Sequence, residues 1–198
     1  MNRILNPVLR IFVFSLFFAS TQGLYSAPLV SGHLRLGLGV EKWPENSAGF
    51  DDQATIGQLS FDFKTPFNPI HYALDFSGTV KEKGRYSVPG TLGELETTTR
   101  SFSFGPRYYH DLGPVDVYGG VSLTYLKTEQ KLSATGVIRN LSDDGLGSTL
   151  VLGLSDLEVF LPKIGWGIEY RMAWIDVDAL IDIQPKEGTW LLTTGIKW

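Results

Sequence analysis

Large apolar residues recur at every second position from residue 33 to the end of this 198-residue chain. A period of two is typical of β-strands, whose successive side chains point to opposite faces, whereas a helix repeats about every 3.6 residues. The sequence therefore predicts an all-β protein. Its apolar stripes indicate eight strands, at about residues 34–40, 59–63, 72–80, 102–108, 115–125, 164–170, 175–183 and 190–198.

The positions between the apolar residues are small or polar, as at Gly37, Ser60, Asp75 and Ser103. Alternation alone leaves two barrels open: a soluble, lipocalin-like barrel with the aromatic rings inside, and a transmembrane barrel with the rings outside. The lumen of eight strands has room only for the side chains that fill it. It cannot hold the large residues of all eight stripes, so we expect the rings to face lipid.

The expected connections alternate in length. Short ones at residues 64–69, 110–113 and 172–173 alternate with long ones at about 41–54, 81–96 and 127–156, and 185–188 is a short exception. Short periplasmic turns and longer outer loops are typical of outer-membrane barrels, which predicts both termini on the periplasmic side. Residues 133–159 could extend the neighbouring strands, but we interpret them as a long loop with hairpin character.

The first 27 residues have the pattern of a secretory signal peptide. Arg3 and Arg10 accompany an apolar run from Ile11 to Ala19, and no acidic residue is present. This run is about half as long as a membrane-spanning helix, which favours export and cleavage over a permanent anchor. We expect a signal peptide at residues 1–27, with cleavage at about 20–29, and a barrel at residues 28–198.

Composition excludes several classes of protein. The chain has no cysteine, which excludes a lipid-anchored lipoprotein, a disulfide-stapled scaffold and thiol chemistry. Residues 1–27 hold two arginines and no acid, so the expected mature chain has a net charge of −6 rather than −4. This acidic balance gives no electrostatic reason to bind nucleic acid.

The last expected strand ends in an aromatic residue. Its alternation through Gly195 and Ile196 to Trp198 is similar to the terminal-strand assembly signal of outer-membrane proteins. The segment Gly165–Arg171 resembles the sixth strand, and Phe104–Tyr109 the fourth strand, of OmpA/OmpW-like eight-stranded outer-membrane barrels. The resemblance implies an antiparallel up-and-down transmembrane β-barrel, assembled by the barrel-assembly machinery and periplasmic chaperones. Full-length OmpA-type proteins also have a peptidoglycan-binding domain, which we do not expect here because the sequence stops at Trp198. It implies no particular activity.

Acids and bases are nearly balanced on the stripe expected to face the lumen. Charges in a narrow lumen must be paired or hydrated. Two interpretations remain: an ion path or gate, and a salt-bridged plug, which we favour because eight strands leave little room for water. We expect Arg107 and Asp116 to share one layer with Glu169, Arg171 and Asp176. The expected network comprises Arg35, Asp62, Asp75, Arg107, Asp116, Glu169, Arg171, Asp176 and Asp178.

Two kinds of catalytic centre have little support. Asp176, Asp178 and Asp182 share an expected strand, but no other ligands converge on them, so we expect no metal. The three histidines, His33, His71 and His110, all fall at the periplasmic end. A lipid-modifying hydrolase needs its nucleophile and base at the outer rim. We therefore expect a protein that is not an enzyme and has no cofactor.

Amphipathic rings favour the headgroup level of a membrane. We expect Tyr108, Trp174 and Trp198 near the periplasmic end and Tyr125 and Trp190 near the outer end. Outer-membrane lipids and lipopolysaccharide are therefore expected partners, and the outer loops are the expected carriers of any extracellular ligand site. We favour a structural or surface-interaction protein acting through these loops. A narrow porin-like channel is the alternative, and a lipid-modifying enzyme is less favoured.

Overall fold

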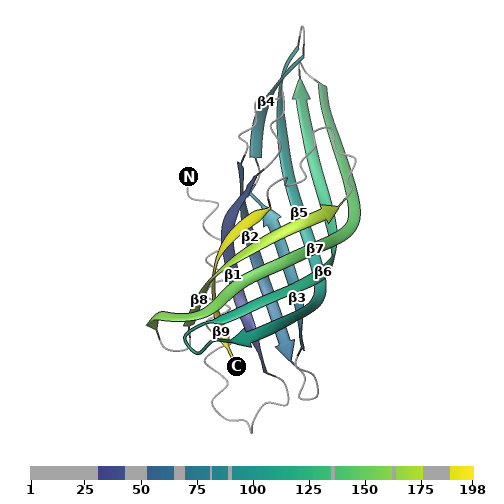
Figure 1. Cartoon of the computed structure of the whole chain (residues 1–198). Coiled ribbons are helices and arrows are strands. Elements are labelled where there is room, and N and C mark those ends of the chain that lie inside the picture. Colours follow the sequence, from purple (N-terminus) through teal and green to yellow (C-terminus); the bar gives the residue numbers. More distant parts are fainter. Residues whose placement is uncertain are drawn as a thin grey trace.

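The structure is a computed structural model that describes residues 31–42, 53–64, 70–80, 82–88, 91–134, 137–161, 164–175 and 188–198 (Figure 1). The strands in these segments are β1 (Ser31–Lys42), β2 (Gln53–Lys64), β3 (Ile70–Thr79), β4 (Glu82–Val88), β5 (Thr91–Asp111), β6 (Asp116–Ala134), β7 (Val137–Leu161), β8 (Ile164–Ile175) and β9 (Thr189–Lys197). None of the described segments forms a helix that is long and apolar enough to cross a membrane. The expected signal peptide lies outside the described residues.

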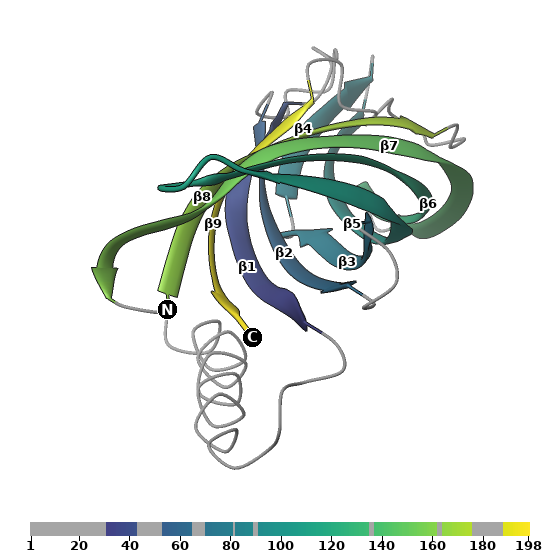
Figure 2. The same ribbon diagram turned by 60° about the horizontal axis from the view of Figure 1, so that its bottom comes forward.

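Eight of these strands form a closed antiparallel ring (Figure 2). β3 pairs directly with β5, and β1 pairs with β9 to close the ring. β4 pairs with β5 beyond the ring. The predicted eight-stranded antiparallel up-and-down barrel is confirmed.

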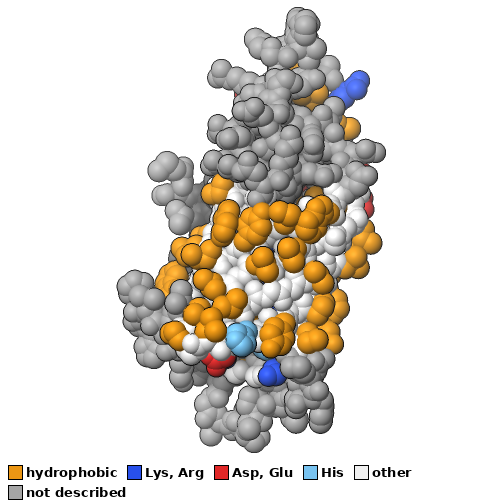
Figure 3. All heavy atoms as spheres, viewed as in Figure 1, with side chains coloured by type: hydrophobic (Ala, Val, Ile, Leu, Met, Phe, Trp, Pro, Cys, Tyr) orange, Lys and Arg blue, Asp and Glu red, His pale blue; other side chains and the backbone are white. Residues whose placement is uncertain are grey.

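The two faces of the barrel divide the side chains as predicted. On β3, Ala73 and Asp75 have 0% and 1% of their surface exposed, whereas the neighbouring Phe76 is 47% exposed. Figure 3 shows hydrophobic side chains spread over the outside of the barrel. The outward stripe of β6 has no charged residue from Val117 to Tyr125. This stripe spans about 20 Å of barrel height if the strands rise about 3.3 Å per residue and tilt by about 40°, close to the apolar band of a transmembrane barrel.

Connections differ between the two ends of the barrel. Residues 65–69, 112–115 and 162–163 join strands at the end where the chain terminates. Residues 43–52 and 176–188 join strands at the opposite end. We name the first the C-terminal end and the second the loop end. The three connections at the C-terminal end have two to five residues, whereas those at 43–52 and 176–188 have 10 and 13, but the long loop expected at 127–156 is replaced by a two-residue connection at 135–136.

Residues 133–159, expected to form a long loop, are mostly strand. β7 contains 25 residues and pairs with β6 from Val137 to Ser155. From Gly147 onward it also pairs with β8. The stretch is therefore the second arm of a long hairpin, and β7 is a member of the ring.

The expected turn at Met172 and Ala173 is wrong. Both residues lie inside β8, opposite Leu150 and Thr149 of β7. The turn that precedes β8 is at residues 162–163. The strand expected at 175–183 lies, beyond its first residue, outside the described residues. β8 pairs directly with β9, and the eighth strand of the ring is β7, which lies between β6 and β8.

Four strands continue past the loop end as a sheet. β4 and residues 91–99, 128–134 and 137–143 of β5, β6 and β7 pair side by side, and we name them the sheet extension (top of Figure 1). β5, β6 and β7 contain 21, 19 and 25 residues. A strand needs only about 9–11 residues to cross a membrane, so these three project well beyond one.

The last strand closes the ring against the first. β9 pairs with β1 over nine residue pairs, ending at His33 and Lys197. Trp198 then continues the ladder, because its backbone N–H and C=O both form hydrogen bonds of 3.0 Å with Gly32. Closure of the ring leaves no unpaired strand edge in contact with lipid. An unpaired backbone N–H or C=O in that environment costs on the order of several kcal/mol.

Deleting Gly195 to Trp198 removes the part of this seam nearest the C-terminal end. We expect the truncated protein to remain unassembled and sensitive to protease, because β1 would keep an unpaired edge. Heat-modifiable migration on a denaturing gel measures closure. Trp198→Phe keeps both the backbone bonds and an aromatic ring, and should assemble like the wild type. Normal insertion of the truncated chain would contradict the prediction.

Candidate functional site

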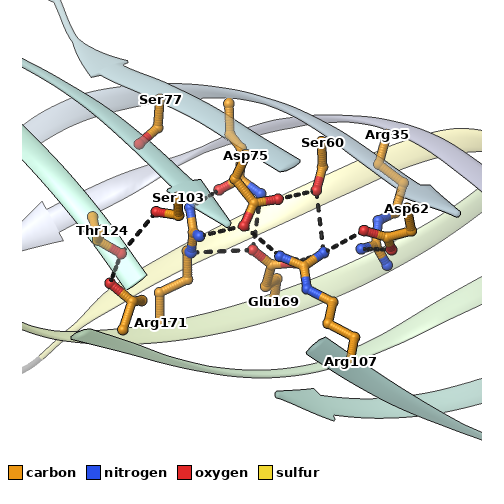
Figure 4. A network of polar contacts seen from close by, with 12 residues as sticks. Arg35, Ser60, Asp62, Asp75, Ser77, Ser103, Arg107, Thr124, Glu169 and Arg171 are labelled. Atoms are coloured by element: carbon orange, nitrogen blue, oxygen red, sulfur yellow. Dashed lines mark hydrogen bonds and ion pairs between the residues drawn. The ribbon is translucent and has the colours of Figure 1, made fainter. Parts of the chain in front are cut away.

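Six charged side chains meet inside the barrel, all shielded from solvent (Figure 4). They come from five strands and comprise three cations and three anions. We name this set the lumen charge cluster: Arg35 of β1, Asp62 of β2, Asp75 of β3, Arg107 of β5, and Glu169 and Arg171 of β8. A lone buried ion is very costly, so balanced charge is a condition for burying this many.

Arg107 lies at the centre of the cluster and is fully buried. Its Nη2 donates to Asp75 Oδ2 at 2.5 Å. Its Nη1 donates to Asp62 Oδ1 at 3.0 Å and to Ser60 Oγ at 3.1 Å. Glu169 Oε2 lies 4.0 Å from the same nitrogen. One guanidinium thus links three carboxylates that belong to three other strands.

Arg171 connects the cluster to the next layer toward the loop end. Its Nη2 donates to Asp75 Oδ2 at 2.6 Å, the same oxygen that Arg107 contacts. Its Nη1 donates to Gln58 Oε1 at 2.7 Å, and Gln58 Nε2 donates to Glu169 Oε1 at 2.9 Å. Three strands on opposite sides of the lumen are therefore joined by direct hydrogen bonds.

Arg35 lies nearer the C-terminal end, between an acid and a ring. Its Nη2 contacts Asp62 Oδ2 at 2.5 Å, and its Cζ lies 4.3 Å from the ring centroid of Tyr118. The Tyr118 hydroxyl donates to Glu169 Oε2 at 2.6 Å. A cation over an aromatic face is attracted by the ring quadrupole, and the attraction strengthens where water is excluded.

A stack of rings continues from the cluster to the C-terminal end. Tyr109 stacks on Tyr118 with 5.0 Å between centroids, and its hydroxyl donates to Asp62. His33 and His71 lie 5.0 Å and 4.4 Å from the Tyr109 ring. Sequence reasoning assigns no role to Tyr109 or Tyr118, although the alternation puts Tyr118 on the stripe that faces the lumen. Their inward positions in the alternation were the available signal.

Small hydroxyl side chains line the lumen on the loop side of the cluster. Ser103 Oγ lies 2.9 Å from Thr124 Oγ1, which lies 2.7 Å from Thr149 Oγ1. Ser77 and Ser101 share a hydrogen bond of 2.6 Å. These pairs bridge neighbouring strands of the wall, so polar contacts between side chains continue beyond the charged layer.

Glycines on neighbouring strands make room for the largest inward side chains. A Cβ placed on Gly195 would lie 2.7 Å from Arg35 Cγ, and one on Gly153 would lie 2.3 Å from Tyr118 Cζ. Both distances are far below a normal contact. The narrow lumen holds an arginine or a tyrosine because the residue opposite has no side chain.

Not every residue of the expected network belongs to the cluster. Asp116 faces Asp111 across the hairpin turn, and its Oδ2 accepts a 3.0 Å bond from Lys197 Nζ at the C-terminal end. The single layer expected to contain both Arg107 and Asp116 is therefore wrong, because Arg107 faces Gly120 farther from that end. The expected positions Asp176 and Asp178 lie outside the described residues, as does Asp182. No metal-binding group of three or more His, Asp or Glu residues occurs among the described residues.

One aromatic residue lies at the opposite end from the one expected. Trp174 is near the end of β8, beyond the Arg171–Thr189 pair, and so lies at the loop end. The sequence predicts Trp174 at the same end as Tyr108 and Trp198 because it indicates a short periplasmic turn at Met172 and Ala173, directly before Trp174. Tyr108 and Trp198 lie at the C-terminal end, whereas the other two expected interface residues, Tyr125 and Trp190, lie toward the loop end.

The sheet extension carries a groove of about 420 Å³. Its walls come from β5, β6 and β7, with acids, a lysine and uncharged polar groups in close proximity. The lining residues are Glu96, Thr98, Glu129, Gln130, Lys131, Asn140, Leu141 and Ser142.

No protein-family model and no curated protein sequence matches this chain. Solved structures do match it. Ail, the attachment invasion locus protein of Yersinia pestis, is 17% identical, with a TM-score of 0.54 over 87% of this chain and 100% of Ail. A major outer membrane protein from Thermus thermophilus is 12% identical, with a TM-score of 0.57 over 86% and 100% of the two chains. The chain has the fold of an eight-stranded outer-membrane β-barrel.

A third barrel, the outer membrane protein OprG from Pseudomonas aeruginosa, is 11% identical and has a TM-score of 0.52 over 85% of this chain and 95% of OprG. The expected resemblance to eight-stranded outer-membrane barrels is thus confirmed for the fold. At these identities the similarity carries no residue roles, so the function of this barrel has to be argued from its own side chains.

Replacing Arg107 with alanine leaves Asp62 and Asp75 buried with fewer cations. We expect the free energy of unfolding to fall by about 3–5 kcal/mol, the usual effect of removing one partner from a buried ion pair. Urea titration of the protein in lipid vesicles measures this change. Arg139→Ala is the matched control, because Arg139 is exposed on the sheet extension, and it should change stability by less than about 0.5 kcal/mol. Equal effects of the two substitutions would contradict the prediction.

Proposed function

We propose that this protein is an exported outer-membrane barrel with a closed lumen, and that it acts as a structural or surface-interaction protein through the sheet extension. The observation that carries the proposal is the lumen charge cluster. It joins β1, β2, β3, β5 and β8 across the interior by direct contacts between buried side chains. A lumen crossed in this way leaves little continuous space for a solute.

The outward face supports a location in a membrane. Rings such as Phe61, Phe76 and Phe104 are exposed on the outside of the barrel, where water would disfavour them and lipid would not. The expected signal peptide and the aromatic Trp198 agree with export and assembly in the outer membrane. Short connections are typical of the periplasmic side, so we place the C-terminal end there and the sheet extension outside the cell.

The sheet extension is the part best placed to meet a partner. Among the structures of similar fold, one contains Ail in complex with the heparin analogue sucrose octasulfate. The groove of this protein has Glu96 and Glu129 beside Lys131, a mixture that does not favour such a polyanion. Its hydroxyl and amide groups fit a neutral polar ligand better, such as the hydroxyl groups of a sugar.

A narrow channel is the second candidate, because polar and charged side chains make up much of the lumen wall. The cluster would then have to open. An enzyme is less favoured, since His33 and His71 are buried at the C-terminal end and His110 lies in the strand that ends there. None of the three histidines can act as a base at the outer rim.

In a planar lipid bilayer we expect the wild-type protein to show little or no steady conductance, because the cluster fills the lumen. Arg107→Ala should open a small leak, since it removes the central cation, and Arg139→Ala should not. Single-channel recording after refolding measures both. A large, stable conductance of the wild type would contradict a closed lumen and favour the channel.

Cell fractionation tests the location. We expect the mature protein in the outer-membrane fraction, with migration on a denaturing gel that changes on heating, because a closed barrel resists detergent until it is boiled. Recovery as a soluble periplasmic protein would contradict the proposal and favour the lipocalin-like alternative.

A further inference from the structure

The outside of the barrel changes from apolar to charged within one row of paired residues near the loop end. The last apolar row across β5, β6 and β7 consists of Phe102, Tyr125 and Leu146, all exposed. The next row toward the sheet extension consists of Arg100, Lys127 and Asp144. Two residues along a strand span about 7 Å, so this charged row lies just above the apolar band. In a membrane this is the level of the lipid headgroups.

Two cations stand directly opposite each other in this row. Arg100 and Lys127 are cross-strand partners, and such partners have their Cβ atoms about 5 Å apart. Like charges in this arrangement destabilise a sheet. Lys127 Nζ lies 3.2 Å from Glu129, but both side chains are more than 40% exposed, and an exposed pair of this kind contributes little. Within the described part of the chain, Arg100 forms no ion pair. An external anion would offset the repulsion.

Beside Arg100 the barrel surface is flat. Its other cross-strand partner is Gly78, which in turn pairs with Gly57, and both glycines face outward. A Cβ on Gly57 would meet only Leu38 Cδ2, at 4.0 Å, and neither glycine has a positive φ. Packing and backbone geometry therefore do not require glycine at residue 57. Glycine inside a strand weakens it and often marks a place where a ligand approaches the backbone.

We propose that Arg100 and Lys127 bind a phosphate of an outer-leaflet lipid headgroup, as in lipopolysaccharide, and that the headgroup lies over Gly78 and Gly57. The proposal rests on the proposed function, which places the sheet extension outside the cell. The acyl chains of the same lipid would lie against the row of Phe102 and Tyr125. Guanidinium and ammonium groups are the usual protein ligands of phosphate, and the guanidinium can bind two oxygens at once.

The acids around the site limit what it accepts. Asp144 lies on the far side of Lys127 from Arg100, and Glu129 lies one row farther toward the sheet extension. An anion therefore approaches from the glycine side, where the described surface has no acid in this row. A small free anion would contact only the two cations, whereas a lipid would also contact the apolar row of Phe102 and Tyr125 below them. We therefore expect binding of the lipid and no measurable competition by free phosphate.

The test is a titration of the refolded protein in detergent with lipopolysaccharide, with binding measured by native mass spectrometry. Three arms use phosphorylated lipopolysaccharide, the same material after dephosphorylation, and the phosphorylated form with millimolar inorganic phosphate as competitor. The double variant Arg100→Gln and Lys127→Gln should bind the phosphorylated lipid about tenfold or more weakly, since each basic residue near an anionic surface contributes about 1 kcal/mol. Gly57→Val should also weaken binding, because its side chain would occupy the flat surface.

The matched control is Lys64→Gln with Arg139→Gln, which removes one cation from the C-terminal end of the barrel and one from the sheet extension, both outside the proposed site and outside the groove. It should bind within about twofold of the wild type. Equal weakening by the two double variants would overturn the site, as would equal binding of dephosphorylated lipid or displacement by inorganic phosphate. Heat-modifiable migration shows that each variant is folded. If the wild-type protein does not insert into a membrane, the proposed location is contradicted. If it inserts and the double variant Arg100→Gln and Lys127→Gln still binds the lipid normally, only this site is overturned.

Discussion

The narrow bore of an eight-stranded ring is the constraint on which the rest of this structure depends. Eight strands enclose a space that side chains can just fill, so the large rings are placed outside and small or polar groups inside. Two of the large side chains inside lie against a glycine of the neighbouring strand: Arg35 lies against Gly195, and Tyr118 lies against Gly153. Charge follows the same rule, because ions can be buried there only as a balanced, mutually bonded set.

The sequence predicted the all-β class, the number of strands in the ring and the direction of its faces, because lipid outside and a narrow lumen inside impose a strict alternation. It failed where that environment ends. Beyond Leu146, β7 leaves the apolar band, so polar residues such as Ser142 and Asp144 occupy outward positions and the stripe disappears. The alternation from Leu150 to Leu154 remains in the ring part of β7, but residues 133–159 as a whole were interpreted as one long loop, and the turn at residues 162–163 was placed at Met172 instead.

The membership of the charge cluster was less predictable than its existence. Inward acids and bases are visible in the alternation, but which of them meet depends on the register around the ring, and one misplaced strand changes it. Asp116 therefore joins Lys197 instead of Arg107. Sequence reasoning also gave no role to Gln58, which accepts from Arg171 and donates to Glu169. A buried amide becomes informative only when its two partners are known.

The bonds of Arg171 and Gln58 join residues that are far apart along the chain. Arg171 contacts Asp75 and Gln58 across 96 and 113 residues of sequence, and Gln58 contacts Glu169 across 111. β8 reaches its final place beside the early strands only after most of the protein has been synthesised. Asp75 meets Arg107 across 32 residues of sequence, but its second guanidinium, from Arg171, arrives only with β8. The charge cluster is therefore completed, and water is excluded from it, only late in folding, when β8 has joined the early strands.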